Sequence, residues 1–407
     1  MDKKLVLERA KLAADYMIEN QFTNRSDANH GRFRGAYEQS VGKISYTNSW
    51  QTGACCMGLL AMFKRTGDKK YLKAALRAGD YLKSLQNLDS RNMRYYGMIR
   101  ESTPQTVEFC PRDAVTGCWA FIWLFRETQD QEYLDRAVIF AEWHMKYAMY
   151  NGWPTYTLFV NHAHRDFLAR GCFQSGVGLF YYDLFNVTDD CRYIEKGLKP
   201  IADIYQRDFL TEDGSIIPER DVFTNKISER ALKENDDNIH FYNDDFGCPM
   251  LLKAAEIFGE RSYFDSAKRF AHWLAAHQQP DGMFRTKVKD VSSAVPMALM
   301  YYHEIGEKEQ DKILLEARDK TLQKLLDMQL QDTDDRALYG AFEGFPDENH
   351  KADCRRSTNM RTTMYSLISL LKTEGKIRNF WLGGNLNDAF MDPLDYLKVM
   401  PWDESED

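Results

Sequence analysis

The stretch Thr66-Gly67-Asp68-Lys69-Lys70-Tyr71-Leu72 is a polar turn between an apolar run and an amphipathic run. Similar stretches return at 128–134, 188–194 and 259–264, each with an apolar run before it and an amphipathic run after it. A period of roughly 60 residues, built from two helices and a short turn, predicts an array of α-hairpins. The number of hairpins then selects the fold.

The apolar pattern divides the chain into six hairpins. Amphipathic outer helices are predicted over 4–19, 70–87, 131–148, 190–207, 261–278 and 311–330. Inner helices, more apolar and richer in small residues, are predicted over 49–65, 112–127, 170–186, 244–258, 291–304 and 358–372. A helix that is apolar nearly all round is buried on all sides. The pattern therefore predicts an all-α protein with an (α/α)6 barrel over 1–375, and an extension over 376–407 that packs on the barrel or frays.

Composition limits the partners that the chain can have. A net charge of −8 argues against general nucleic-acid binding, and the 407 residues contain no apolar run of membrane-spanning length. The start, Met1-Asp2-Lys3-Lys4, leads into a charged helix rather than a signal-peptide core. We expect a cytoplasmic protein, or a periplasmic one if a leader has been removed. The oligomeric state is left open, with a homodimer among the states allowed.

The eight cysteines contain no CxxC pair. Five of them lie among apolar residues of predicted helices: Cys55, Cys56, Cys118, Cys172 and Cys248. This pattern favours buried free thiols in a reducing compartment over a disulfide framework or a zinc site.

The connections between helices fall into a short set and a long set. Turns from an inner to an outer helix are short, whereas those from an outer to an inner helix span 20–48, 88–111, 149–169, 208–243, 279–290 and 331–357. Long structured loops in a compact domain are usually functional. All six emerge where the inner helices begin, so we expect a cleft at that end of the barrel. Helix N-termini there favour an anionic ligand.

These long loops concentrate aromatic residues, arginines, histidines and carboxylates. Aromatic faces stack on sugar rings, and the arginine fork binds a carboxylate with two hydrogen bonds. Glycosidic chemistry needs two carboxyl groups, or one with an oriented water. The combination predicts an oligosaccharide ligand that carries an acidic sugar. Each residue alone has a plainer interpretation: a loop arginine forms a surface ion pair, and Asp113, Asp244 or Asp245 caps a helix.

Three segments carry a likeness to a known family. They are Trp50-Gln51-Thr52-Gly53 with its following turn, Arg112-Asp113-Ala114-Val115-Thr116-Gly117, and Ala169-Arg170-Gly171-Cys172-Phe173-Gln174-Ser175-Gly176. From its start to the fourth turn, the chain resembles the six-hairpin glycosidase superfamily, especially unsaturated glucuronyl hydrolases and related glucuronidases. The resemblance implies the (α/α)6 barrel and gives Asp113 the role of general acid or base. Trp50-Gln51 and Cys172-Phe173 depart from the family pattern, which leaves saturated and unsaturated uronates both open.

The expected activity is that of an exo-acting glycoside hydrolase that releases a terminal glucuronate-type residue. Glu38 or Glu108 is the candidate for the second carboxylate beside Asp113. The candidate substrate-binding residues are the stacking rings Trp50, Tyr242 and Tyr339, the uronate clamp Arg34, Arg170 and Arg361, and also Arg112, His162 and His164. No cofactor and no metal is expected, because the trio His162, His164 and Asp166 lacks a supporting fourth ligand.

Three other interpretations remain open. A sugar epimerase of the N-acylglucosamine 2-epimerase type has a barrel of similar length and uses paired histidines, for which His162, His164, His240 and His350 are available. A uronate lyase with a Tyr/His/Arg set is another enzyme class. A toroid that only binds a glycan or a protein is the third, and it is disfavoured because so many titratable residues converge on one predicted rim.

Overall fold

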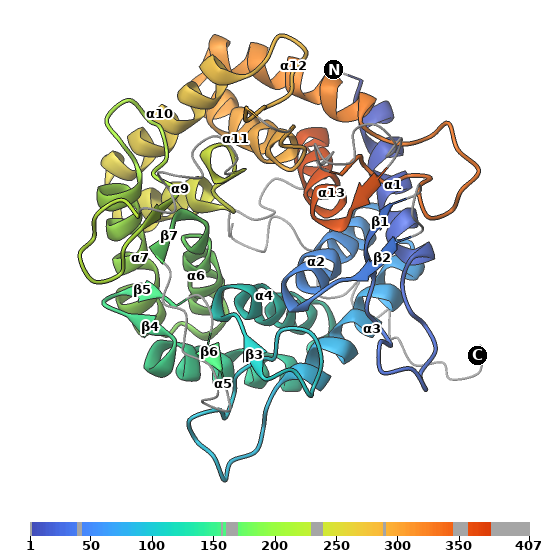
Figure 1. Cartoon of the computed structure of the whole chain (residues 1–407), viewed down its shortest axis with the longest axis vertical. Helices are drawn as coiled ribbons and strands as arrows, with labels where there is room; N and C mark the ends of the chain where they lie inside the picture. The colour runs from blue at the N-terminus through green and yellow to red at the C-terminus, as the bar shows by residue number, and fades with distance from the viewer. Residues whose placement is uncertain are drawn as a thin grey trace.

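The computed structural model describes residues 2–38, 43–155, 158–159, 170–228, 239–287, 290–344 and 357–375. In this part of the chain, twelve α-helices form two concentric rings (Figure 1). The inner ring contains α2 (Ser49–Thr66), α4 (Pro111–Thr128), α6 (Val177–Thr188), α9 (Gly247–Phe258), α11 (Ala294–Glu309) and α13 (Met360–Glu374). The outer ring contains α1 (Lys3–Glu19), α3 (Lys69–Leu85), α5 (Gln131–Tyr147), α7 (Lys199–Ile204), α10 (Arg261–His277) and α12 (Lys312–Asp327). The predicted (α/α)6 barrel is confirmed.

The repeated turn ends an inner helix and starts the next outer helix at once. In its first copy the Thr66 hydroxyl donates to the Met62 carbonyl at 2.7 Å, and Gly67 ends α2 with a left-handed φ of 72°. The Asp68 side chain then accepts from the Lys70 amide at 3.0 Å and caps α3. Corresponding left-handed residues and aspartate caps occur at Gln129 with Asp130, and at Asp189 with Asp190. The motif is therefore structural.

Close packing of the inner ring depends on small residues. Every residue of α2 from Thr52 to Met62 is buried, and α2 packs against both α4 and α13. A Cβ added to Gly53 would lie 2.4 Å from the Thr116 carbonyl oxygen of α4. Glycine therefore sets the approach of these two helices.

Four elements differ from the sequence prediction, and one of them is the fifth inner helix, which begins at Ala294 rather than 291. The third inner helix was predicted from residue 170, but strand β7 (Arg170–Gly171) and a 3-10 turn (Cys172–Gln174) precede α6. The fourth inner helix begins at Gly247 rather than 244, because Asp245 and Phe246 have left-handed φ angles of 46° and 80°. The fourth outer helix is divided into α7 and two flanking π-helical segments, 193–198 and 205–209. Pro200 lies in its middle and lacks the amide that a regular helix requires.

Short strands tie the long loops together at the end where the inner helices begin. Strand β1 (Arg34–Glu38) pairs with β2 (Lys43–Tyr46) and also with β9 (Ser357–Asn359), which joins the first long loop to the last. Two-residue ladders join β3 (Glu108–Phe109) to β6 (Leu158–Phe159), β4 (Met149–Tyr150) to β5 (Trp153–Pro154), and β7 to β8 (Glu219–Arg220). The β1–β9 ladder and the contact of α1 with α13 close the ring (Figure 1).

Ion pairs gather toward the opposite ends of the inner helices. The pairs are Lys64–Glu127 at 2.7 Å, Arg65–Glu374 at 2.8 Å, Arg126–Asp183 at 3.4 Å, Lys253–Glu256 at 2.6 Å, and Lys372–Glu304. Cations are favourable near helix C-termini, where carbonyl groups lack amide partners. Ion pairs thus stabilise this end of the barrel, whereas the long loops cover the opposite end.

Two further expectations can be compared with the described residues. All seven cysteines described there are free, and the five named in the sequence analysis are buried. None of the described helices has the length and apolar character needed to cross a membrane.

Candidate functional site

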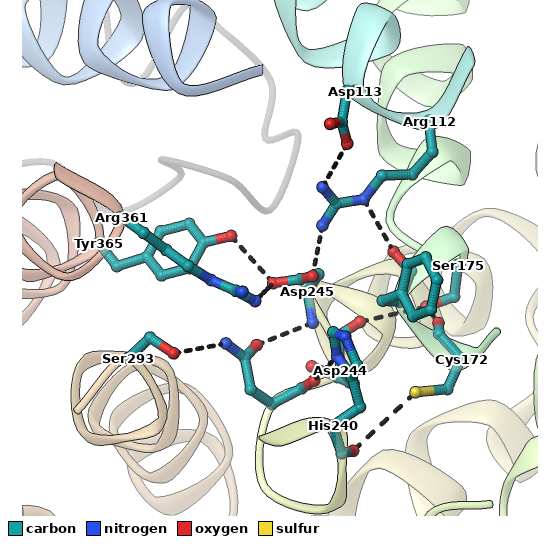
Figure 2. A network of polar contacts seen from close by, with 12 residues as sticks. Arg112, Asp113, Cys172, Ser175, His240, Asp244, Asp245, Ser293, Arg361 and Tyr365 are labelled. Carbon is teal, nitrogen blue, oxygen red and sulfur yellow. Dashed lines mark hydrogen bonds and ion pairs between the residues drawn. The ribbon is translucent and has the colours of Figure 1, made fainter. Parts of the chain in front are cut away.

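Asp245 lies at the centre of a polar network that joins three inner helices (Figure 2). Its carboxylate accepts hydrogen bonds from Arg112 of α4, from Nη2 of Arg361 at 2.6 Å and from the Tyr365 hydroxyl at 3.0 Å. Arg361 and Tyr365 both belong to α13, while Asp245 itself precedes α9. Residues more than 100 positions apart therefore meet on one buried carboxylate.

The backbone at Asp245 has an uncommon conformation that its surroundings maintain. Left-handed φ angles at Asp245 and Phe246 each cost about 1–3 kcal/mol in residues with a side chain. The Asp245 amide donates to Oδ1 of Asn243 at 3.0 Å, and Nδ2 of Asn243 donates to the Ser293 hydroxyl at 3.1 Å. Gly176 admits the Asp245 carbonyl, since a Cβ there would lie 2.3 Å from its oxygen. Backbone strain of this kind is typical of functional sites.

Asp113, the predicted acid or base, lies in the first turn of α4 with 14% of its side chain exposed. Its Oδ1 accepts from Nη1 of Arg112 at 2.7 Å, and its Oδ2 from Nδ2 of Asn48 at 3.4 Å. Arg112 also donates through Nε to the Phe173 carbonyl at 3.2 Å. Each guanidinium nitrogen of Arg112 therefore has an acceptor, and the guanidinium links Asp113 to Asp245.

Trp50 forms an aromatic platform next to both arginines. The guanidinium carbon of Arg112 lies 4.7 Å from the centre of the indole ring, and that of Arg361 lies 5.2 Å from it. Tyr365 meets the same indole edge-on at 6.1 Å. These contacts hold the two arginines side by side through cation–π attraction.

The electrostatics of the network favour the charged forms of Asp245 and Arg112. Burial alone would raise the pKa of Asp245, but Arg361 and Arg112 hold it below its ordinary value. Burial likewise acts against the charge of Arg112, yet Asp245 and Asp113 raise its pKa above the usual value. The opposite charges of Asp245 and Arg112 therefore compensate each other although both side chains are buried.

Two titratable neighbours of this network behave differently from it. Burial raises the pKa of Asp244 to about 6, while Tyr205, Tyr301 and the Cys248 amide donate to its carboxylate. Burial lowers the pKa of His240 to about 4, so its imidazole is neutral at pH 7. His240 stacks on Phe173 at 4.6 Å, and because Nδ1 faces the Asn243 carbonyl at 3.1 Å, Nδ1 carries the proton.

Four of the sequence-predicted site residues come together, and others lie elsewhere. Trp50, Arg112, Asp113 and Arg361 belong to the network above. The side chains of Glu38 in β1 and Glu108 in β3 are not described, and His162 and His164 lie outside the described residues.

The remaining predicted residues have partners of their own. Arg170 pairs with Asp208 at 2.7 Å and donates to Asn225 at 2.6 Å. Arg34 lies over the Tyr37 ring at 5.7 Å. The Tyr242 ring packs on Trp273 and Phe284, and Tyr339 is 46% exposed. None of these contacts involves a member of the Asp245 network.

The sequence analysis gave no site role to Asp245, Asn48 or Glu101. Asp244-Asp245 before an apolar run has the pattern of an ordinary helix cap, and Asn48 has the same pattern before α2. Their distant partners are not visible in any local pattern. The sequence signal that could have identified these residues is the number of carboxylate and amide side chains at the starts of inner helices, all at one end of the barrel.

One group of the described residues has the spacing of metal ligands. Single ligand atoms of Glu101, Cys110 and Asp113 lie within 4.8 Å of one another. However, Asn48 donates to both carboxylates, and Arg112 donates to Asp113. Protein donors thus contact both oxygens of Asp113 and one oxygen of Glu101.

Comparison with known proteins gives structural likeness only. No family model matches the chain, and no curated protein matches it in sequence. Among solved structures, cellobiose 2-epimerase from Bacillus thermoamylovorans B4167 is 12% identical with a TM-score of 0.68, covering 90% of this chain and 98% of its own. The unsaturated glucuronyl hydrolase of Bacillus sp. GL1 is 15% identical with a TM-score of 0.64, covering 92% and 98%.

A third structure widens the range of activities found on this architecture. It is an inactive variant of an α-1,6-mannanase from Salegentibacter sp. HEL1_6, bound to α-1,6-mannotriose. It is 15% identical with a TM-score of 0.62, covering 91% of this chain and 99% of its own. The fold of this chain is therefore the (α/α)6 barrel that six-hairpin glycosidases and sugar epimerases share.

Proposed function

We propose that the protein is an exo-acting glycoside hydrolase that releases a terminal uronic acid, saturated or unsaturated, from an oligosaccharide. The observation that supports this most is the Arg112–Asp113 pair beside Arg361 and Trp50, at the rim where inner helices begin. An acid/base group, a cationic group and an aromatic face are the three elements that such a substrate requires. The likeness to a glucuronyl hydrolase fold is consistent with this proposal.

In this proposal each residue has one role. Asp113 transfers the proton at the glycosidic bond or activates the water. Trp50 provides the apolar surface against which the sugar ring packs. Among the described residues, the Arg361 side chain makes one hydrogen bond, through Nη2 to Asp245, so its other amino group is the donor proposed for the sugar carboxylate. The ladders β1–β9 and β3–β6 border the rim, which favours attack at a chain end.

The activity is tested by comparing an aryl glucuronide with an unsaturated uronate disaccharide and with neutral aryl glycosides. We expect release of the uronate and little turnover of the neutral sugars. Asp113→Asn should then lower kcat by at least about 100-fold, because general acid–base catalysis contributes this much. Asp68→Asn is the matched control, since it caps α3 at the opposite end and asparagine caps equally well.

Two results would contradict the proposal. Turnover of neutral glycosides alone would show that the acidic sugar is wrong. Near-normal activity of Asp113→Asn on a uronoside would remove Asp113 from the mechanism.

The second candidate is a sugar epimerase, and one observation favours it. His240 is neutral and stacks against Phe173, next to the Arg112–Asp245 ion pair, and a neutral imidazole is suited to removing a proton from carbon. A free sugar incubated with the protein in deuterated water would exchange a carbon-bound proton if the protein is an epimerase. A hydrolase leaves that position unlabelled.

A further inference from the structure

Asn48 has two separate functions in the structure, one local and one across the barrel. As the cap of α2, its Oδ1 accepts from the Gln51 amide at 3.0 Å, and the Gln51 side chain accepts from the Asn48 amide at 3.4 Å. Its Nδ2 points the other way and donates to Oε1 of Glu101 at 2.5 Å and to Oδ2 of Asp113 at 3.4 Å. A helix cap needs only the oxygen of this side chain. The amide nitrogen therefore requires another explanation.

The amide lies between two carboxylates that would otherwise repel each other. Ligand oxygens of Glu101 and Asp113 lie within 4.8 Å of each other. The backbone carbonyl of Glu101 also accepts from the Ser49 amide at 2.9 Å, which fastens the loop before β3 to the start of α2. Glu101 is thus held in place by α2 itself, and it anchors the Asn48 amide through the shorter of the two hydrogen bonds.

The two oxygens of Asp113 consequently have unequal partners. Oδ1 accepts a charge-assisted hydrogen bond from Arg112 at 2.7 Å. Among the residues that the structure describes, Oδ2 has only the long contact with Asn48. The titratable and charged groups around Asp113 are Arg112 on its own helix, Glu101 and Cys110 from the preceding loop, and Asp245 beyond Arg112.

We infer that Asn48 is a positioning residue that aims Oδ2 of Asp113, the oxygen that exchanges the proton with the substrate, and that Glu101 anchors Asn48. This inference rests on the proposed hydrolase function. It assigns Glu101 a place beside Asp113 that the sequence analysis gave to Glu38 or Glu108. Because the amide lies between the two carboxylates, Glu101 supports the acid through Asn48 rather than attacking the sugar.

Cap-preserving substitutions separate this role from the helix cap. Serine and aspartate cap helices about as well as asparagine, so Asn48→Ser should fold and melt as the parent does. Asn48→Asp also keeps the cap, but it should melt at a lower temperature because its carboxylate lies beside those of Glu101 and Asp113. We expect Asn48→Ser to lower kcat at least about 10-fold with KM changed less than about 3-fold, because orientation is lost while binding is not. Glu101→Gln retains an acceptor for the amide and should keep more of kcat than Glu101→Ala. Asp68→Ser, the same kind of cap change on α3, should leave kcat unchanged.

Asn48→Asp gives a sharper result, because it puts a third carboxylate beside two others. A like charge at this distance favours protonation, so the acid limb of the pH–rate profile should move up by about one pH unit or more. The carboxyl ¹³C titration of Asp113, assigned with Asp113→Asn, should show the same displacement without any substrate.

The outcomes separate this inference from the proposed function. Absence of uronoside hydrolysis with a displaced ¹³C titration would refute the hydrolase but retain the coupling of Asn48 to Asp113. Hydrolysis by the parent with an unchanged kcat and pH profile in Asn48→Ser and Asn48→Asp would overturn the inference. An unchanged ¹³C titration in Asn48→Asp would overturn it as well.

Discussion

At the scale of single residues, the site is governed by charge compensation rather than by free charges. Asp245 is 3% exposed and receives three hydrogen-bond donors, two of them guanidinium groups. Arg112 and Arg361 are therefore fixed before any ligand arrives. Under the proposed function, a substrate carboxylate competes with Asp245 or uses the remaining donors, so Asp245 sets how much positive charge the rim offers.

Removing the Asp245 charge should destabilise the protein at neutral pH and much less in acid. Asp245→Asn leaves two buried arginines with Asp113, on Arg112, as the one remaining carboxylate of the network, at a cost of about 3 kcal/mol. Because the arginines hold the pKa of Asp245 below its ordinary value despite burial, this stabilisation is present above about pH 4 and is lost as the pH falls through the lower folded-state pKa. Urea unfolding of parent and variant at pH 7 and pH 3 measures the difference. A difference of equal size at both pH values would contradict the assignment.

His240 should contribute acid sensitivity in a different pH window. Burial lowers its pKa to about 4, whereas an unfolded chain takes up the proton near pH 6.5. The unfolded state therefore binds more protons between these values, and stability falls as the pH drops from about 6.5 to 4. His240→Gln should flatten this part of the curve in urea titrations, whereas His277→Gln, on the exposed face of α10, should not. Equal effects of the two variants would show that His240 is not the source.

At the scale of helices, the inner ring is defined by how closely α2 and α4 approach. Gly53 faces a backbone carbonyl of α4, while an added Cβ at Gly58 in the same helix would meet side chains, Leu367 at 3.1 Å and Ile368 at 4.0 Å. Both helices also begin at the rim, so their packing sets the position of Asn48 relative to Asp113. An error in this packing would therefore be transmitted directly to the site.

The two glycines of α2 should respond oppositely to alanine. Gly53→Ala forces its Cβ to 2.4 Å from the Thr116 oxygen and should cost about 1–3 kcal/mol, as overpacking does. Gly58→Ala should be neutral or stabilising by up to about 1 kcal/mol, because alanine is the better helix former and the Leu367 methyl can yield. Thermal unfolding of the two variants provides the comparison. Equal destabilisation by both would mean that helix approach is not limited at Gly53.

At the scale of the whole molecule, the barrel has two chemically different ends. The rim combines long loops, short ladders and the Asp245 network. The opposite end carries ion pairs between inner helices, among them the fully buried Lys372 of α13 with Glu304 of α11. Because the ion pairs at the opposite end stabilise the ring, the side chains of the rim loops can differ without loss of the barrel.

Breaking the Lys372–Glu304 pair from one side should cost more than removing both charges. Burial lowers the pKa of Lys372, and Glu304 opposes this, so Glu304→Gln removes a carboxylate partner from a buried ammonium group at a cost of about 3–5 kcal/mol. The double variant Glu304→Gln with Lys372→Met should recover most of that loss. Chemical unfolding of the two single variants and the double variant gives the coupling energy. Additive effects would show that the pair does not act as a unit.

The features of this protein that could be predicted are the helix boundaries that depend on local sequence patterns. The turn at Thr66–Leu72 combines a threonine, a left-handed position and an aspartate cap in consecutive residues, so its recurrence predicted where helices end and begin. The exceptions were local strains that tertiary contacts impose. Asp245 and Phe246 are left-handed because Asn243, Gly176 and Arg112 hold them there, and no propensity scale contains these contacts.

Sequence alone determined the hairpin count, the barrel and the rim on which Trp50, Arg112, Asp113 and Arg361 lie, because periodicity and loop length are local properties of the chain. Only the tertiary structure decided which of these residues meet. Asp245 joins α4 to α13, and Asn48 joins Glu101 to Asp113, through contacts between residues far apart in sequence. Arg170, equally suggestive in sequence, pairs instead with Asp208. A buried charged side chain pairs with the opposite charge that lies next to it in the folded barrel. Packing of the closed ring determines which residue that is.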